Sequence, residues 1–202
     1  MCGRYYIDES PELQSLTEAM NRSPLVARLL QNSTAVLSHG EIRPANAAPV
    51  IASNRMGKRA VFPMKWGFKG KSLLINAKTE TAAVRPAFRD AWAGHRCIVP
   101  ASWYFEWEHV LMKDGKKKTG DQFMLRPKDS PVTWLCGLYR MEEGIPCFVI
   151  LTREPSEEIR FIHDRMPLML PERCVDEWIN PKADPAQLLH EARTDIQYER
   201  VR

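Results

Sequence analysis

The sequence contains no long apolar run and no secretory signal. No apolar stretch approaches the roughly 20 residues that a helix needs to cross a bilayer. The N-terminus also lacks the basic and then apolar pattern of a signal peptide. We therefore expect a cytoplasmic protein that has no membrane partner.

Paired cysteine motifs are absent as well. The five cysteines are odd in number, widely scattered and without a C-x-x-C pair; they are Cys2, Cys97, Cys136, Cys147 and Cys174. Neither a disulfide framework nor a zinc ribbon is indicated by this spacing. We expect free thiols, with no metal and no cofactor.

What is present is the composition of a folded globular chain. Hydrophobic residues make up 44% and charged residues 27% of the 202 residues, and the mean hydropathy is -0.38. This balance argues against extensive disorder, and the length suits a single domain over residues 1–202. A formal charge of +4 permits an anionic partner without requiring one.

The order of the expected elements predicts the fold class. Ser10-Pro11 and Ser23-Pro24 each place an N-cap residue before a proline at the first helical position. Expected helices cover 11–20, 24–30, 86–93, 172–179 and 186–192, with a short one near 156. Expected strands cover 60–66, 72–75, 97–108, 122–125, 132–139 and 147–151. Turn pairs such as Glu143-Gly144 favour antiparallel connections. We expect an α+β domain, with short helices around a strongly bent antiparallel sheet.

A run of three lysines, Lys116-Lys117-Lys118, follows the expected hairpin turn Asp114-Gly115. A solvated loop is the favoured interpretation. The alternative is contact with phosphates at the edge of a nucleic-acid site.

Four short stretches combine ionisable or polar residues with apolar neighbours: 2–4, 75–81, 103–107 and 161–167. The most unusual is Glu106, between Phe105 and Trp107. Side chains alternate along a strand, so Glu106 shares a face with Tyr104. If that face points inward, Glu106 is a partly desolvated acid that tends to hold a proton. The alternative is an exposed carboxylate or a partner for an arginine.

His163 and Asn76 also have two interpretations each. A histidine that follows a short helix is more often structural than catalytic, and an amide at the end of the Leu73-Leu74-Ile75 run commonly caps a turn. Taken separately, neither residue indicates a function.

The motifs together resemble the SOS-response-associated peptidase (SRAP) family. They occur in the order of that family and run from residue 1 to about 180: Met1-Cys2-Gly3-Arg4, Arg43-Pro44-Ala45-Asn46, Trp66-Gly67, Ile75-Asn76-Ala77-Lys78, Trp103-Tyr104-Phe105-Glu106-Trp107 and Ile162-His163-Asp164-Arg165-Met166-Pro167. The resemblance implies an α+β domain with a curved, barrel-like antiparallel sheet and a basic DNA-binding face.

The function that the resemblance implies is the covalent trapping of abasic sites in single-stranded DNA. Family members form a DNA–protein crosslink through an N-terminal cysteine and so protect the strand during the DNA damage response. Carried over by motif, the catalytic residues are Cys2, Asn76, Glu106 and His163. The implied setting is a nucleoid-associated monomer that works near the replication machinery.

The chemistry explains why a cysteine stands second. Loss of Met1, by an aminopeptidase or by self-cleavage, would leave an α-amine and a thiol on one carbon framework. The amine adds to the open aldehyde of an abasic sugar in Schiff-base, lyase-like chemistry, and the thiol then closes a thiazolidine. At pH 7 about one α-amine in seven but about one thiol in thirty is deprotonated, which favours attack by the amine first.

Supporting roles are expected from the remaining motif residues. Glu106 is the candidate proton acceptor, His163 the candidate acid, and Asn76 offers amide donors to a sugar hydroxyl or a developing oxyanion.

The expected DNA contacts come from six further residues. Arg4, Lys78 and Arg165 are candidate phosphate ligands, and Trp66 and Trp107 are candidates for base stacking. Core packing is the alternative for both tryptophans. The resemblance adds Asn46 to the DNA-binding face. Position 78 is lysine where relatives commonly have arginine, so a compact ammonium charge replaces a planar guanidinium group that can bind a phosphate through two nitrogens.

Two other functions remain open at this stage. The first is a cysteine-type peptidase in which Cys2 is an N-terminal nucleophile, with the Met1-Cys2 bond as its own substrate. The second is a non-covalent single-stranded DNA-binding module in which Cys2 is inert.

Overall fold

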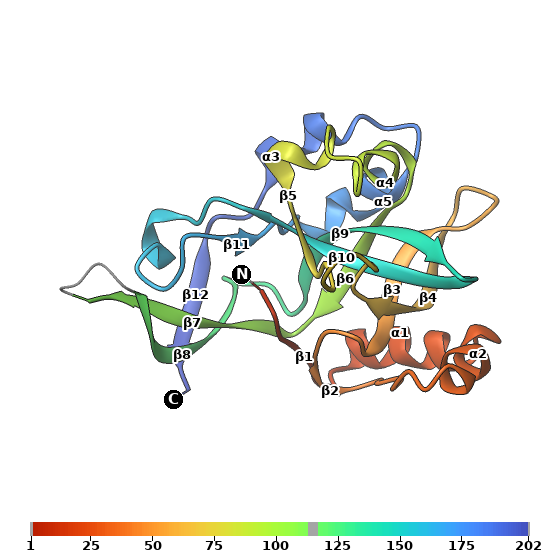
Figure 1. Cartoon of the computed structure of the whole chain (residues 1–202), viewed down its shortest axis with the longest axis horizontal. Coiled ribbons are helices and arrows are strands. Elements are labelled where there is room, and N and C mark those ends of the chain that lie inside the picture. The colour runs from red at the N-terminus through yellow and green to blue at the C-terminus, as the bar shows by residue number, and fades with distance from the viewer. Residues whose placement is uncertain (1, 113–116, 202) are drawn as a thin grey trace.

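Two β-sheets make up most of the fold, and the larger one closes into a barrel (Figure 1). The computed structural model describes residues 2–112 and 117–201. The barrel strands are β3 (Ala47–Ser53), β4 (Arg59–Trp66), β6 (Arg96–Ala101), β9 (Thr133–Glu142) and β10 (Ile145–Arg153). They pair in the cyclic order β10–β4–β3–β6–β9–β10, antiparallel except for the parallel step from β4 to β10. The expected α+β fold with a barrel-like sheet is confirmed.

Two short strands extend the barrel at β10. They are β5 (Asn76–Lys78), which runs parallel to β10, and β11 (Met166–Pro167), which runs antiparallel to it. Both candidate motifs that contain these strands are therefore held against the same barrel strand.

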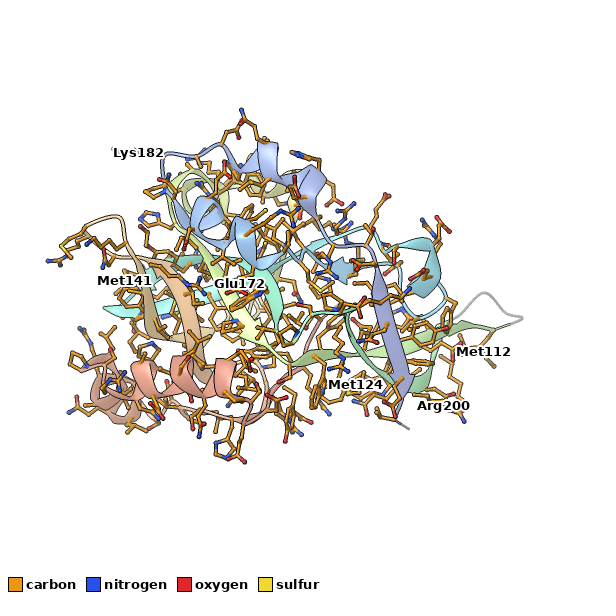
Figure 2. All side chains as sticks on the ribbon, turned by 180° about the vertical axis from the view of Figure 1, so that it is seen from behind. Met112, Met124, Met141, Glu172, Lys182 and Arg200 are labelled. Atoms are coloured by element: carbon orange, nitrogen blue, oxygen red, sulfur yellow. The ribbon has the colours of Figure 1, made fainter. Side chains whose placement is uncertain are left out.

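The second sheet has the order β12–β8–β7–β1–β2. Its strands are β1 (Tyr5–Ile7), β2 (Gly40–Ile42), β7 (Trp103–Leu111), β8 (Lys117–Pro127) and β12 (Ile196–Arg200). Figure 1 shows the long β7–β8 hairpin reaching to one side, with the start of the chain in the middle of the molecule. In Figure 2, which shows the molecule from behind, Met112 and Arg200 lie at the end of the molecule that carries the β7–β8 hairpin. Met141 of β9 lies at the opposite end.

Short helices cover the barrel. The α-helices are α1 (Pro11–Asn21), α2 (Leu25–Gln31), α3 (Thr79–Ala82), α4 (Arg89–Gly94) and α5 (Val175–Ile179). The 3₁₀ helices are Glu157–Ile159, Glu172–Cys174 and Pro185–Glu191. Helix α1 begins as predicted, with Ser10 at the N-cap and Pro11 at the first turn, and it buries Leu13 and Met20. In the described part of the chain, no helix is long and apolar enough to cross a membrane.

Several predicted elements are wrong in detail. The expected strand 97–108 is divided into β6 and β7 at Ser102, which crosses between the sheets. The Ser102 hydroxyl accepts from the Asp8 N–H at 2.8 Å, and its own N–H donates to the Tyr6 carbonyl at 2.8 Å. The expected strand 72–75 is a turn in which Leu74 bridges only to Phe68. The expected helix 186–192 is a 3₁₀ helix, and only Val175–Ile179 of the expected helix 172–179 is α-helical. Pro24, predicted at the first helical position after a Ser23 N-cap, is itself the N-cap of α2.

The predicted turns have different outcomes. Glu143 and Gly144 join β9 to β10 with φ values of 52° and 77°, and positive φ at both central residues defines the two-residue turn that matches strand twist. The Asp114-Gly115 turn and Lys116 lie outside the described residues, although β7 and β8 pair antiparallel as expected. All five cysteines are buried and free, which confirms the prediction of free thiols.

Candidate active site

The first residues of the chain are fixed beside β7. Tyr5 pairs with Tyr104, and the Phe105 N–H donates to the Arg4 carbonyl at 2.9 Å. This antiparallel register brings Cys2 next to Glu106, whose negative charge acts on the Cys2 thiol. Burial, with that charge as a second cause, raises the pKa of the thiol to about 12. Cys2 is fully buried, so its sulfur is protonated at neutral pH.

Asn76 holds the same N-terminal segment from the barrel side. It is the first residue of β5, and its place there is set by pairing with Ile150 of β10. The side-chain Nδ2 donates to the Cys2 carbonyl at 2.8 Å. The Oδ1 atom is buried and accepts no hydrogen bond from the described residues. Asn76 therefore offers an acceptor at the site, whereas one amide donor is already used on Cys2.

Glu106 lies on the inner face of β7, as the alternation predicted. It is 7% exposed, like its neighbour on that face, Tyr104, at 1%. Burial raises the pKa of the Glu106 carboxyl, and the Trp107 N–H, which donates to Oε1 at 3.3 Å, acts in the opposite direction. The predicted inward position and desolvation of Glu106 are confirmed.

His163 lies in the loop that follows the 3₁₀ helix Glu157–Ile159, next to β7, the strand that contains Glu106. The loop is tied to β7 by the His109 N–H, which donates to the Ile162 carbonyl at 3.0 Å. His163 is 7% exposed. Its Nδ1 accepts from the Arg165 N–H at 3.0 Å and lies 2.8 Å from Asp164 Oδ1. A neutral ring accepts from Arg165, and a protonated ring can donate to Asp164, so this environment accommodates both forms.

An open cavity of about 670 Å³ connects several of these residues to solvent. Its walls are formed by Lys78, Glu106, Trp107, His109, Thr119, His163, Asp164 and Arg165. Glu106 and His163 thus face the same space, while the Cys2 thiol is enclosed by protein. The cavity is large enough for a sugar-phosphate unit of a nucleic acid.

His109 is a cavity residue that the motifs did not indicate. Its ring centroid lies 4.1 Å from that of His163. Regular pairing of β7 with β8 shifts between Trp107, opposite Gln122, and His109, opposite Thr119. Such an irregularity re-aims the side chains around it. Gly120, which lies in β8 between Thr119 and Gln122, is a glycine inside a strand and is the sequence signal that could have indicated the shift.

The predicted DNA contacts Lys78 and Trp107 both lie on the cavity wall. Lys78 is exposed. The Arg4 guanidinium carbon lies 4.9 Å from the centroid of the Trp107 ring, a cation–π contact. Arg4 also forms an ion pair with Glu41 at 3.2 Å. Lys78 and Trp107 thus belong to the cavity wall, and Arg4, paired with Glu41, lies against the Trp107 ring.

Trp66 does not support base stacking, because it is wholly enclosed. Its exposed fraction is 0%, its Nε1–H donates to the Ile75 carbonyl at 2.9 Å, and its ring packs on Tyr5 and Phe148. The core-packing alternative applies to Trp66.

Arg165 and Asn46 are also engaged within the protein. Arg165 donates to both carboxylate oxygens of Glu80 at 2.8 and 2.9 Å, and to the Thr152 carbonyl at 2.5 Å. Its charge is therefore neutralised rather than available to a phosphate. The Asn46 Oδ1 accepts from the Arg43 N–H at 2.9 Å and closes a turn.

Comparison with curated proteins gives relatives over most of the chain. The abasic site processing protein YoqW of Bacillus subtilis is 31% identical over 212 residues, which cover 93% of this chain and 84% of that protein. The abasic site processing protein YedK of Escherichia coli is 29% identical over 188 residues, with coverage of 89% and 79%.

Solved structures share the fold. A protein from Bacteroides thetaiotaomicron has a TM-score of 0.73 at 21% identity and covers 100% of this chain and 92% of its own. A phage-related protein from Bordetella bronchiseptica has a TM-score of 0.71 at 22% identity, with coverage of 100% and 94%. The model of the family described as SOS response associated peptidase (SRAP) matches residues 1–202. The chain therefore belongs to the SRAP family.

Proposed function

We propose that this protein recognises abasic sites in single-stranded DNA and traps them through Cys2 as a thiazolidine crosslink. The observation that carries the proposal is the grouping of Cys2, Asn76 and Glu106 beside a cavity that Lys78 and Trp107 also line. The printed names of the relatives, abasic site processing proteins, support the class of substrate.

The reaction requires that Cys2 has a free α-amine. Met1, which lies outside the described residues, must first be removed. The amine then adds to the C1′ aldehyde of the opened sugar, and loss of one water gives an imine. The thiol sulfur adds to the imine carbon, and the thiol proton passes to the nitrogen. The product is a thiazolidine, and water is the only molecule released.

The state of the thiol favours attack by the amine before the sulfur. A thiol with a pKa of about 12 is almost entirely protonated at neutral pH, whereas an α-amine has an ordinary pKa near 8. A protonated thiol is a poor nucleophile. Ring closure therefore follows imine formation, when the sulfur attacks within the same residue at a high effective concentration.

Two ionisable groups serve the proton transfers. Glu106 accepts the proton that the amine loses on addition, because its raised pKa makes it a better base than an ordinary glutamate. His163 gives a proton to the departing hydroxyl, with Asp164 beside its Nδ1 at 2.8 Å. Asn76 keeps the N-terminal segment in place through the Cys2 carbonyl and offers its Oδ1 to a sugar hydroxyl.

The DNA strand is held at the cavity mouth. Lys78 is exposed there and supplies a charge for a phosphate. Trp107, with Arg4 across its ring, gives a flat surface for a neighbouring base. Arg165 acts indirectly, since its ion pair with Glu80 joins the His163 loop to the residues after β5.

The test is a mixture of the protein with a single-stranded oligonucleotide that carries one abasic site. Denaturing electrophoresis and intact mass should detect an adduct equal to the sum of both molecules minus one water. Cys2→Ala should abolish it, and a preparation that retains Met1 should not form it. Borohydride should trap a reducible imine in Cys2→Ser, in which the oxygen closes the ring less favourably.

Two results would overturn the proposal. Salt-sensitive binding with no adduct would indicate a non-covalent DNA-binding module. An adduct that forms in Cys2→Ala and survives denaturation without borohydride would show that the Cys2 thiol is not needed for a stable crosslink.

A further inference from the structure

A histidine, a second histidine and an aspartate meet at the cavity wall from two separate parts of the chain. One ring nitrogen each of His109 and His163 and one carboxylate oxygen of Asp164 all lie within 4.8 Å of one another. His109 belongs to β7, whereas His163 and Asp164 lie in the loop before β11. The His109 N–H bond to the Ile162 carbonyl, at 3.0 Å, holds the two parts together.

We propose that these three side chains bind one divalent transition-metal ion, zinc in particular. Imidazole nitrogens suit zinc, copper and nickel, whereas magnesium and calcium prefer oxygen ligands alone. Two histidines and a carboxylate are also the protein ligands of well-known zinc sites that keep a fourth position open. Here the fourth position faces the cavity.

The state of His109 supports a ligand role independently of the cluster itself. Its Nδ1 is buried and has no hydrogen-bond partner among the described residues. A buried polar nitrogen without a partner destabilises the fold. A metal ion bound through this nitrogen would satisfy it, which no described residue does.

The contact between His163 and Asp164 supplies the other two ligands. Their Nδ1 and Oδ1 atoms are 2.8 Å apart, which is a hydrogen-bond distance. A metal ion that takes the place of the proton between them would bind both atoms. Zinc–nitrogen bonds of about 2.0–2.1 Å place tetrahedral ligands about 3.3 Å apart. The longest separation in the set must therefore shorten by about 1.5 Å. The Asp164 side chain is 64% exposed and can rotate to allow this.

Neighbouring charged groups affect how tightly these three side chains can bind a metal ion. Lys78 lines the same cavity and opposes a cation, and the Arg165 N–H must give up its bond to His163 Nδ1. The Arg165 guanidinium is neutralised by Glu80, and Glu106 adds a carboxylate on the cavity wall. We therefore expect reversible binding that a chelator removes.

An ion at this position has a consequence that rests on the proposed function. It would occupy the His163 nitrogen beside Asp164 and so remove the acid that assists the loss of water. Zinc is expected to inhibit crosslinking, and chelation is expected to restore it.

The primary test measures metal binding without DNA. The full chain is freed of metal with a chelator and titrated with zinc chloride by calorimetry, and with cobalt chloride by visible absorption. One equivalent should bind, with the cobalt spectrum of nitrogen and oxygen ligands. His109→Gln and Asp164→Asn should each weaken binding by roughly tenfold or more. His39→Gln is the matched control, because His39 is an exposed histidine outside the cluster.

The outcomes are separable from those of the crosslinking test. No binding in the wild type, or equal binding in His109→Gln, would overturn the metal site whatever the DNA chemistry proves to be. Thiolate charge-transfer absorption with cobalt would also overturn it, since that signal places the ion on a cysteine. Circular dichroism of each variant verifies that the fold is retained.

Discussion

Replacement of Glu106 by glutamine should stabilise the protein at neutral pH and remove part of the pH dependence of its stability. Glu106 is 7% exposed, and burial raises the pKa of its carboxyl above the ordinary value near 4.3. Below pH 4 the carboxyl is protonated in both the folded and the unfolded state. As the pH rises, the unfolded state loses the proton first, so this group makes stability fall until the pH passes the folded pKa.

The magnitude follows from linkage. Each unit by which folding raises the pKa costs about 1.4 kcal/mol of unfolding free energy at high pH. Glutamine has nearly the same shape and does not ionise, so Glu106→Gln avoids this cost. The gain should be near zero at pH 4 and should reach a plateau above the folded pKa.

The assay is urea unfolding of the wild type and of Glu106→Gln at several pH values between 4 and 8. Glu154→Gln, at an exposed position, is the matched control and should leave the pH profile unchanged. The reasoning is refuted if Glu106→Gln has the same pH profile as the wild type, or if its advantage is larger at pH 4 than at pH 8. The same variant should crosslink about 10²-fold to 10⁴-fold more slowly, since it lacks the base.

Three other results are expected. Burial raises the pKa of the Cys2 thiol from 9.0 to about 12. The rate of its alkylation in the folded protein, followed by peptide mass spectrometry, should therefore still rise about tenfold per pH unit between pH 9 and 10. A plateau of this rate near pH 9 would contradict the burial. Arg165→Ala should lower the unfolding free energy by about 0.5–1.5 kcal/mol, because one hydrogen bond to the Thr152 carbonyl is lost while Thr79 Oγ1 still donates to that carbonyl; an unchanged urea midpoint would exclude this role. Lys78→Ala should weaken binding to single-stranded DNA and lower the salt slope of its affinity by about 0.7, whereas a slope equal to that of the wild type would remove Lys78 from the phosphate contacts.

The placement of the site in the fold was partly predictable, because local patterns determined it. Alternation along 103–107 indicated that Glu106 and Tyr104 share a face, and both are buried. The proline signal at Pro11 gave the start of α1. The Ser102 crossing was not predictable, because one long apolar strand and two strands in different sheets have the same local pattern.

Individual roles depended on partners that lie far away in the sequence. Arg165 is an exposed cation by its residue type, but Glu80, 85 positions away, neutralises it. From the sequence, Trp66 could be either a base-stacking residue or a core residue, and its packing against Tyr5 and Phe148 identifies it as a core residue. His109 was not indicated, because its neighbour His163 comes from a loop 54 positions away in the sequence; Gly120, at the shift in β-pairing, signals a bulge but not which side chain it re-aims.

The sequence by itself determined the chemistry that this chain can carry and the family to which it belongs. A cysteine in second position can combine an amine and a thiol only after one residue is lost, and that property needs no fold. The tertiary structure alone decided the conditions under which these groups work. Burial beside Glu106 keeps the Cys2 thiol protonated, and Asn76, 74 residues away, holds its carbonyl, because a pKa and a position depend on neighbours that only folding brings together.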